Sequence, residues 1–164
     1  MNFNIVPIEE KHIEGFWEVL DSVSRERQYL TFLEGPPIDT TRAFVLHGIA
    51  ANWAHFVAVA EGKIIGWCDI SAFDNRPVIA HVGKLGMGVL ASHRGHEIGS
   101  ALMKAALNKA KENGLTRIEL QVRENNKPAI ALYKKFGFVE EGRHINASCI
   151  DGKYDNHISM ARLY

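Results

Sequence analysis

The sequence has few cysteines, no excess of charge of either sign and no long apolar run. Its two cysteines, Cys68 and Cys149, are too few for a disulfide framework and lack the spacing of metal ligands, so we expect free thiols and no metal. The balance of 19 acidic and 19 basic residues leaves no overall field to attract nucleic acid. No stretch of about 18 apolar residues occurs and no basic, then apolar, leader begins the chain, so we expect a cytoplasmic protein without a membrane span or export signal.

What is present is the composition of an ordinary globular domain. A chain of 164 residues that is 46% hydrophobic and 23% charged can bury a sizeable core. Because no repeat, linker or low-complexity segment interrupts the chain, we expect a single domain over residues 1–164.

Apolar periodicity and turn residues predict an alternation of strands and helices. Strands are expected at residues 3–7, 55–60, 63–70, 78–90, 117–122, 138–141 and 154–163. Helices are expected at residues 9–23, 39–53, 98–113 and 129–136. In the second helix we expect a buried stripe formed by Ala43, Phe44, Leu46, His47, Ile49, Ala50 and Trp53. Glu61-Gly62 is a two-residue connection of the hairpin kind.

This order predicts an α/β fold with a single mixed, mostly antiparallel sheet and helices on both faces. A parallel strand pair is expected where the crossover helix joins the strand at Leu85 to the strand at Leu120. Gly83, Gly86 and Gly88 are poor strand formers, which indicates a bulge or a close approach to this backbone. Ligands of such sheets bind where neighbouring strands part, beyond their carboxyl ends.

The stretch from residue 85 to residue 102 passes from an apolar strand through a glycine-bearing turn into a helix. A helix N-terminus leaves backbone N–H groups without partners and carries a partial positive charge, so such a turn can hold a phosphate. Gly95 and Gly99 allow a close approach, Arg94 adds a cation and Ser100 a hydroxyl. A turn without a bound phosphate stays open as the alternative, because many such turns only pack a helix against a sheet.

Two motifs make the sequence resemble the GCN5-related N-acetyltransferase (GNAT) family over nearly its whole length. The first is Arg94-Gly95-His96-Glu97-Ile98-Gly99, which matches the family's acetyl-CoA pyrophosphate loop. The second, more specific motif is Asn126-Lys127-Pro128-Ala129-Ile130-Ala131-Leu132-Tyr133-Lys134-Lys135-Phe136-Gly137-Phe138. The resemblance implies acetyl-CoA as cosubstrate, no metal, and a central parallel strand pair that a bulge splays apart.

The resemblance also implies roles for individual residues. Tyr133 would protonate the leaving CoA thiolate, and Asn126 would hydrogen-bond the pantetheine arm or nearby atoms. The remaining residues implied to contact the cofactor are Met87, Gly88, Val89, Arg94, Gly95, His96, Glu97, Ile98, Gly99 and Ser100. From its sequence position alone, a tyrosine on an amphipathic helix is more often a core residue with a hydrogen-bonded hydroxyl.

The chain departs from the family pattern at the pyrophosphate loop and at the base. Glu97 occupies the fourth motif position, where a glycine is usual, and a carboxylate near a diphosphate weakens binding unless it faces solvent or pairs with a cation. We expect a solvated acid in the first helical turn, which suits the helix dipole. Gly83 and Leu85 stand where relatives often carry Glu or His, so the amine is deprotonated either by ordered water or by His81, on the same strand face.

We therefore expect an N-acetyltransferase in which a primary amine attacks acetyl-CoA directly in a ternary complex. The acceptor, a small molecule or a peptide, is expected to contact residues 29–37, 71–77 and 141–154. The alternative is a non-catalytic acyl-CoA-binding sensor or regulatory module; a purely structural domain would not require Asn126 and Tyr133 at their spacing. Whether the closing strands pair across a homodimer stays open.

Overall fold

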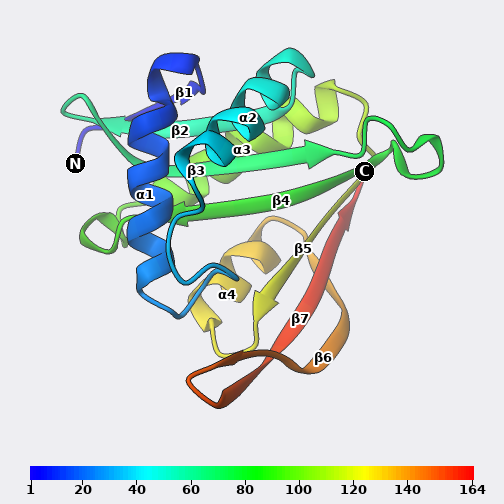
Figure 1. Cartoon of the computed structure of the whole chain (residues 1–164). Coiled ribbons are helices and arrows are strands. Elements are labelled where there is room, and N and C mark those ends of the chain that lie inside the picture. Colours follow the sequence, from blue (N-terminus) through cyan, green and yellow to red (C-terminus); the bar gives the residue numbers. More distant parts are fainter.

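A seven-stranded sheet in the order β1-β2-β3-β4-β5-β7-β6 forms the centre of the computed structural model, which describes all 164 residues (Figure 1). The strands are β1 (Asn4–Pro7), β2 (Ala54–Ala60), β3 (Lys63–Ala72), β4 (Val82–Val89), β5 (Arg117–Arg123), β6 (Val139–Ile150) and β7 (Lys153–Leu163). The α-helices are α1 (Ile13–Arg25), α2 (Ile38–Ala50), α3 (Ile98–Glu112) and α4 (Lys127–Lys135). The predicted mixed sheet with helices on both faces is confirmed.

β4 and β5 are the one parallel pair, and they separate soon after they meet. Their pairing covers only Val82–Lys84 of β4 and Arg117–Glu119 of β5, whereas all other neighbouring strands are antiparallel. Beyond Lys84, β4 continues to Val89 paired with β3 alone. The predicted splay is therefore present, and its opening points toward the N-terminus of α3.

The bulge predicted in this strand is absent. β4 pairs with β3 without a register shift from Gly83 to Val89. Gly88 instead makes room for a side chain of the protein itself, because a Cβ at this position would lie 2.4 Å from the Trp67 ring. The close approach that the glycines indicated is thus, at Gly88, an indole packed against the backbone.

Two apolar cores lie on opposite faces of the sheet. α3 and α4 cover the larger core with residues such as Leu102, Met103 and Tyr133, and Phe138 follows α4 into the same cluster. α1 covers the smaller core, where Phe16 packs edge-on against Trp67 with 5.6 Å between ring centroids. Figure 1 shows α1 and α2 in front of the sheet and α3 and α4 behind it.

The predicted hairpin is confirmed, with Glu61 and Gly62 at φ of +50° and +75° between β2 and β3. Several predicted boundaries differ from the structure, among them the start of α1 at Ile13 instead of residue 9 and the end of α2 at Ala50 instead of residue 53. The helix α2 begins after Pro37, residues Pro77–Ile79 form a 3₁₀ turn before β4, and β6 is much longer than the predicted segment 138–141.

The predicted buried stripe of α2 is wrong. The residues that face the core are Thr41, Val45 and Gly48. Ala43, Phe44, Leu46, His47, Ile49 and Ala50 are exposed, and Trp53 lies beyond the helix and is only partly buried. Apolar side chains occur all round this helix, so their spacing does not identify the inward side.

Other sequence expectations concern thiols, metals and membranes. Both cysteines are free, with Cys68 buried in the larger core and Cys149 exposed on β6. No group of three or more His, Cys, Asp or Glu side chains is arranged to hold a metal ion. None of the helices combines the length and the apolar character that crossing a bilayer requires.

Candidate active site

A cavity of about 450 Å³ lies at the end of β4, beyond the fork at which β5 separates from this strand. Its walls come from the end of β4, the loop before α3, the first turn of α3 and the start of α4. Eleven of the predicted site residues line it: Met87, Gly88, Val89, Arg94, Gly95, Glu97, Ile98, Gly99, Ser100, Asn126 and Tyr133. The two sequence motifs, about 30 residues apart in the chain, thus form one site.

The N-terminus of α3 provides the anion-binding end of this cavity. The first main-chain hydrogen bond of the helix runs from Ala101 N–H to the Glu97 carbonyl, so the N–H groups of Ile98, Gly99 and Ser100 have no helical partner. No side chain caps the helix. Gly95, at φ of +80° and in open space, turns the chain toward it. The helix dipole and these free donors favour a negative ligand.

Glu97 lies at the N-cap of α3, not in its first turn, and has a left-handed backbone with φ of +64°. For a non-glycine residue this conformation costs about 1 kcal/mol. Its side chain is 79% exposed and its carboxylate is 4.0 Å from the ammonium group of Lys135 on α4. The departure from the family glycine therefore retains the loop shape that glycine would favour, while the carboxylate points to solvent beside a cation.

Arg94 is tied to the protein, in contrast to the free cation that its sequence position suggested. Its Nε donates to the Val89 carbonyl at 2.9 Å, and its two terminal nitrogens donate to the Glu26 carboxylate at 2.9 and 2.6 Å. The guanidinium group also lies 4.8 Å from the centre of the Tyr29 ring. Because the Glu26 charge offsets its own, Arg94 chiefly joins the end of β4 to the loop after α1.

Tyr133 is 8% exposed and belongs to the larger core, yet it also lines the cavity. Its hydroxyl forms no hydrogen bond with another protein group and is not sealed from the cavity. Burial, and to a lesser extent the neighbouring Cys68 thiol, raise the pKa of Tyr133. The phenol therefore holds its proton at neutral pH and can donate it to a group in the cavity.

The side-chain amide of Asn126 has an oxygen that caps a helix and a nitrogen that is free to bind a ligand. Its Oδ1 accepts the Ala129 N–H at 3.3 Å and so caps α4, which begins with Lys127-Pro128. Its Nδ2 has no protein acceptor among the hydrogen bonds of the structure, and the residue borders the cavity. The sequence motif thus fixes the start of α4 and leaves an amide donor facing the site.

Two predicted residues lie outside the cavity. His96 is exposed and contributes no lining surface. His81 is exposed in the turn before β4, where its carbonyl accepts the N–H groups of Thr116 and Arg117. Six residues of strand separate it from Met87, a distance of about 20 Å. The structure therefore gives no support to His81 as the base, because the residue lies outside the cavity and at the far end of the strand.

The cavity is also lined by residues to which the sequence analysis assigned no role in cofactor binding. Pro128, Ala129 and Leu132 come from α4, whereas Val23, Tyr29 and His93 come from α1, the loop after it and the turn after β4. Leu132 and the α4 residues fall within the second motif. Tyr29 lies in a loop that was expected to cover a site, but nothing in the sequence indicates its contact with Arg94.

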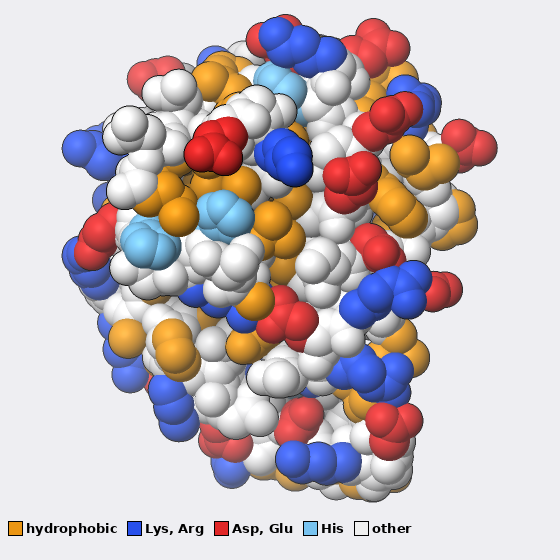
Figure 2. Space-filling model, turned by 90° about the vertical axis from the view of Figure 1, so that its left-hand side faces the viewer, with side chains coloured by type: hydrophobic (Ala, Val, Ile, Leu, Met, Phe, Trp, Pro, Cys, Tyr) orange, Lys and Arg blue, Asp and Glu red, His pale blue; other side chains and the backbone are white.

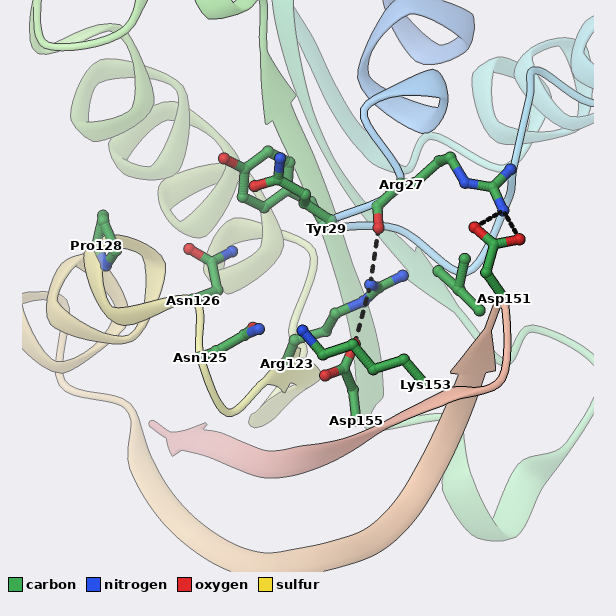
Figure 3. Close-up of a pocket in the computed structure, with 11 residues that line it drawn as sticks. Arg27, Tyr29, Arg123, Asn125, Asn126, Pro128, Asp151, Lys153 and Asp155 are labelled. Atoms are coloured by element: carbon green, nitrogen blue, oxygen red, sulfur yellow. Dashed lines mark hydrogen bonds and ion pairs between the residues drawn. The ribbon is translucent and has the colours of Figure 1, made fainter.

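A second cavity of about 510 Å³ adjoins the first and shares Tyr29, Asn126 and Pro128 with it. Figure 3 shows its three sides: the loop after α1 with Arg27, the end of β5 with Arg123, and the hairpin between β6 and β7. Two segments expected to contact the acceptor thus border it, one through Tyr29 and the other through Ile150, Asp151 and Lys153. The third, the turn at 71–77, contributes nothing and lies beyond the opposite end of the sheet.

Buried and exposed ion pairs shape the second cavity. Arg123 is 4% exposed and donates to the carbonyls of Arg27 at 3.2 Å and Leu30 at 2.6 Å, and its Nη1 lies 3.5 Å from Asp155. Arg27 pairs with Asp151 across the cavity at 2.8 Å. These contacts hold the loop after α1 against β5 and the hairpin, and they leave a cavity rich in both charges (Figure 3).

The outer surface near the site has no field of one sign. Figure 2 shows the side on which β4 ends, where basic, acidic and histidine side chains are interspersed. Because acidic and basic residues also balance over the whole chain, attraction of an anion depends on the local donors of α3.

Comparison with known proteins shows which protein family the sequence matches. The family model described as "Acetyltransferase (GNAT) family" matches residues 17–138. The L-amino acid N-acetyltransferase AaaT of Escherichia coli is 35% identical over 109 residues, which are 65% of this chain and 66% of that protein. The match thus spans just under two thirds of that relative's own length.

Solved structures share the fold over nearly the entire chain. An acetyltransferase of the GNAT family from Streptococcus pneumoniae superposes with a TM-score of 0.91 at 28% identity, over 99% of this chain and 100% of that one. YncA, a putative acetyltransferase from Salmonella typhimurium solved with its cofactor acetyl-CoA, reaches a TM-score of 0.92 at 13% identity, over 99% of this chain and 94% of that one.

Proposed function

The chain belongs to the GNAT family of acetyltransferases, and from that premise we propose that it transfers an acetyl group from acetyl-CoA to a primary amine. One observation carries the proposal: a single cavity joins the free N–H groups of α3 to the unpartnered hydroxyl of Tyr133. The first suits a diphosphate and the second suits a leaving thiolate. The YncA structure with acetyl-CoA supports the same cosubstrate here.

The proposed cofactor path follows the unpaired edge of β4. Since β5 leaves β4 after Lys84, backbone groups of Leu85–Val89 on that side have no strand partner. The amide groups of a pantetheine arm can pair with such an edge as an added strand does. The diphosphate then lies at Gly95–Ser100, and the thioester reaches inward along β4 toward Tyr133 and Asn126.

The chemistry follows from the groups at the fork. A neutral amine attacks the thioester carbonyl, the C–N bond forms, and the C–S bond breaks as the thiolate leaves. Tyr133, whose pKa burial raises, gives its proton to the sulfur. The ammonium form of the amine loses one proton before the attack, and the nitrogen loses a second after the C–N bond has formed. Ordered water carries both away, and Tyr133 regains its proton from solvent.

The second cavity is the proposed acceptor site, because it adjoins the first at Tyr29 and Asn126. The acceptor is the primary amine of a small molecule or a peptide. The name of AaaT, an L-amino acid N-acetyltransferase, supports the smaller class. Arg27, Arg123 and Lys153 suit an acceptor that carries a carboxylate besides its amine.

A non-catalytic acyl-CoA sensor is the second candidate, favoured by Glu97 and by the lack of a base on β4. Release of free CoA thiol from acetyl-CoA, measured over a panel of amino acids, polyamines and peptides, separates the two. Amine-dependent thiol release supports the enzyme. Tight acetyl-CoA binding without release on any amine supports the sensor, and absence of binding contradicts both.

A further inference from the structure

We propose that Asp69 of β3 is the general base of the reaction, which takes the proton of the acceptor amine through one bridging water. The inference rests on the acetyltransferase function proposed above and names the group toward which that water passes the proton. No sequence motif indicated this residue.

Asp69 lies at the point where the fork begins. It is paired in register with Gly86, which is only two residues beyond Lys84, the last residue of β4 that pairs with β5. Its Oδ2 is 3.4 Å from the position that a Cβ on Gly86 would occupy. Asp69 itself lines neither cavity, but Gly88, the next residue of β4 on the same face, lines the cofactor cavity. Because Gly86 has no side chain, the residue paired with Asp69 does not cover the carboxylate.

Asp69 and the proposed acid, Tyr133, lie on opposite faces of the sheet. Trp67 belongs to the core under α1, and Asp69, two residues on, lies on the same face. Cys68 between them points the other way, into the core that contains Tyr133. An amine can therefore approach the thioester from the α1 face while the thiolate leaves toward Tyr133.

The nearest neighbours of Asp69 are neutral groups that add no charge beside the carboxylate. The indole N–H of Trp67 donates to its Oδ2 at 3.1 Å. Opposite it on β2 stands His55, 3% exposed, without a hydrogen-bond partner, and packed against the rings of Phe16 and Phe44. Burial lowers the pKa of His55 to about 3, so this neighbour is neutral.

The one cation of β4 on the same face as Asp69 is Lys84. It lies opposite Ser71 in the strand register, and it is exposed. The side chains that α1 buries are apolar, Phe16 among them, except for Ser24, whose hydroxyl donates to the Leu20 carbonyl. With no cation bound to the carboxylate, burial raises the pKa of Asp69 to about 7, and the Trp67 hydrogen bond opposes part of that rise. A carboxylate of this basicity exchanges protons efficiently at neutral pH.

Every proton that the reaction moves has a donor and an acceptor. The ammonium form of the acceptor gives one proton through water to Asp69, and the neutral amine attacks the thioester. The amine keeps one proton too many after C–N bond formation, and the same water relay takes it once Asp69 has released the first to solvent. Tyr133 protonates the thiolate and regains its proton from solvent.

The test compares Asp69→Asn with wild type, using thiol release at saturating acetyl-CoA over pH 5.5 to 9. Asparagine still accepts the Trp67 N–H, so the fold and the KM for acetyl-CoA are expected to stay unchanged. We expect kcat to fall by about 100-fold, the usual contribution of a general base. The rise of kcat/KM for the amine with its midpoint near pH 7 should disappear.

A second variant provides a readout that a structural role would not move. Trp67→Phe removes the hydrogen bond that lowers the pKa of Asp69, so the midpoint of the rise should move above pH 7. In the double variant with Asp69→Asn, the tryptophan change should leave the profile unaltered. Asp74→Asn is the matched control, because Asp74 accepts the Trp53 indole N–H at 2.8 Å in the same way but away from the fork.

Each result decides the matter. An Asp69→Asn enzyme with wild-type kcat and an unchanged rise near pH 7 overturns the role of Asp69 while leaving the acetyltransferase function intact. An unmoved profile in Trp67→Phe does the same even where Asp69→Asn fails to fold. A wild-type protein that releases no thiol with any amine contradicts the proposed function, and the base with it.

Discussion

Replacing Glu97 tests how the unusual residue of the pyrophosphate loop acts. In Glu97→Gly the left-handed backbone becomes unstrained, but glycine also loses more freedom on folding. The two effects are each about 1 kcal/mol and of opposite sign, so the free energy of unfolding should change little. The effect should appear in acetyl-CoA binding, because the substitution removes a negative charge beside the proposed diphosphate site.

The size of this effect follows from the exposure of the side chain. Glu97 is 79% exposed, so the dielectric is close to that of water. At about 7 Å each pair of unit charges repels by about 0.6 kcal/mol, and two phosphate charges give about 1.2 kcal/mol. Screening at physiological salt lowers this to about 0.5 kcal/mol, a two- to threefold change in Kd. Loss of Glu97 also frees the ammonium group of Lys135.

Isothermal titration with acetyl-CoA at 0.05, 0.15 and 1 M salt is the assay. Glu97→Gln is the matched control, since it removes the charge and keeps a side chain of the same size on the left-handed backbone. Both variants should bind two- to threefold more tightly at 0.15 M salt, and the gain should vanish at 1 M. A gain limited to glycine would assign the effect to the backbone, and no gain in either variant would refute the electrostatic reasoning.

Two further predictions concern the scaffold of the site. Gly88→Ala should destabilise the protein by about 1–3 kcal/mol, because its Cβ would meet the Trp67 ring at 2.4 Å, whereas Gly142→Ala, in open space, should leave the melting temperature unchanged. Equal melting temperatures for the two variants would contradict the packing argument. Glu26→Gln should speed hydrogen exchange of residues 26–37 about fivefold, since it weakens the half-buried pair with Arg94 by about 1 kcal/mol; unchanged exchange would show that the pair does not hold the loop.

The parts of the fold with strong local signals could be predicted from the sequence. The hairpin at Glu61-Gly62 and the helix that ends before Gly114 have turn residues that only a few structures accept. The inward side of α2 could not be predicted, because Val45 and Gly48 face the core while larger apolar residues such as Ile49 stay exposed. There, tertiary packing decides between sides that look alike in the sequence.

Some residues of the candidate site could likewise be predicted from the sequence, and others could not. The residues around Arg94 and Asn126 belong to motifs, and the structure brings both to one cavity. His81 lies outside this cavity, because strand alternation predicts a face of the sheet but not which residues of that face border a cavity. Asp69 could not be found by any motif, since its position beside Gly86 depends on the register of β3 against β4. Contacts across strands are set by pairing, which the local sequence does not encode.

The most direct test of the proposed chemistry is the Tyr133→Phe variant. Turnover and acetyl-CoA binding are measured with the best acceptor of the amine panel, and Tyr164→Phe, whose hydroxyl bonds the Leu107 carbonyl outside the cavity, is the control. If Tyr133 protonates the thiolate, kcat falls by about 100-fold while the Kd of acetyl-CoA changes less than threefold. Wild-type kcat in Tyr133→Phe would contradict the account.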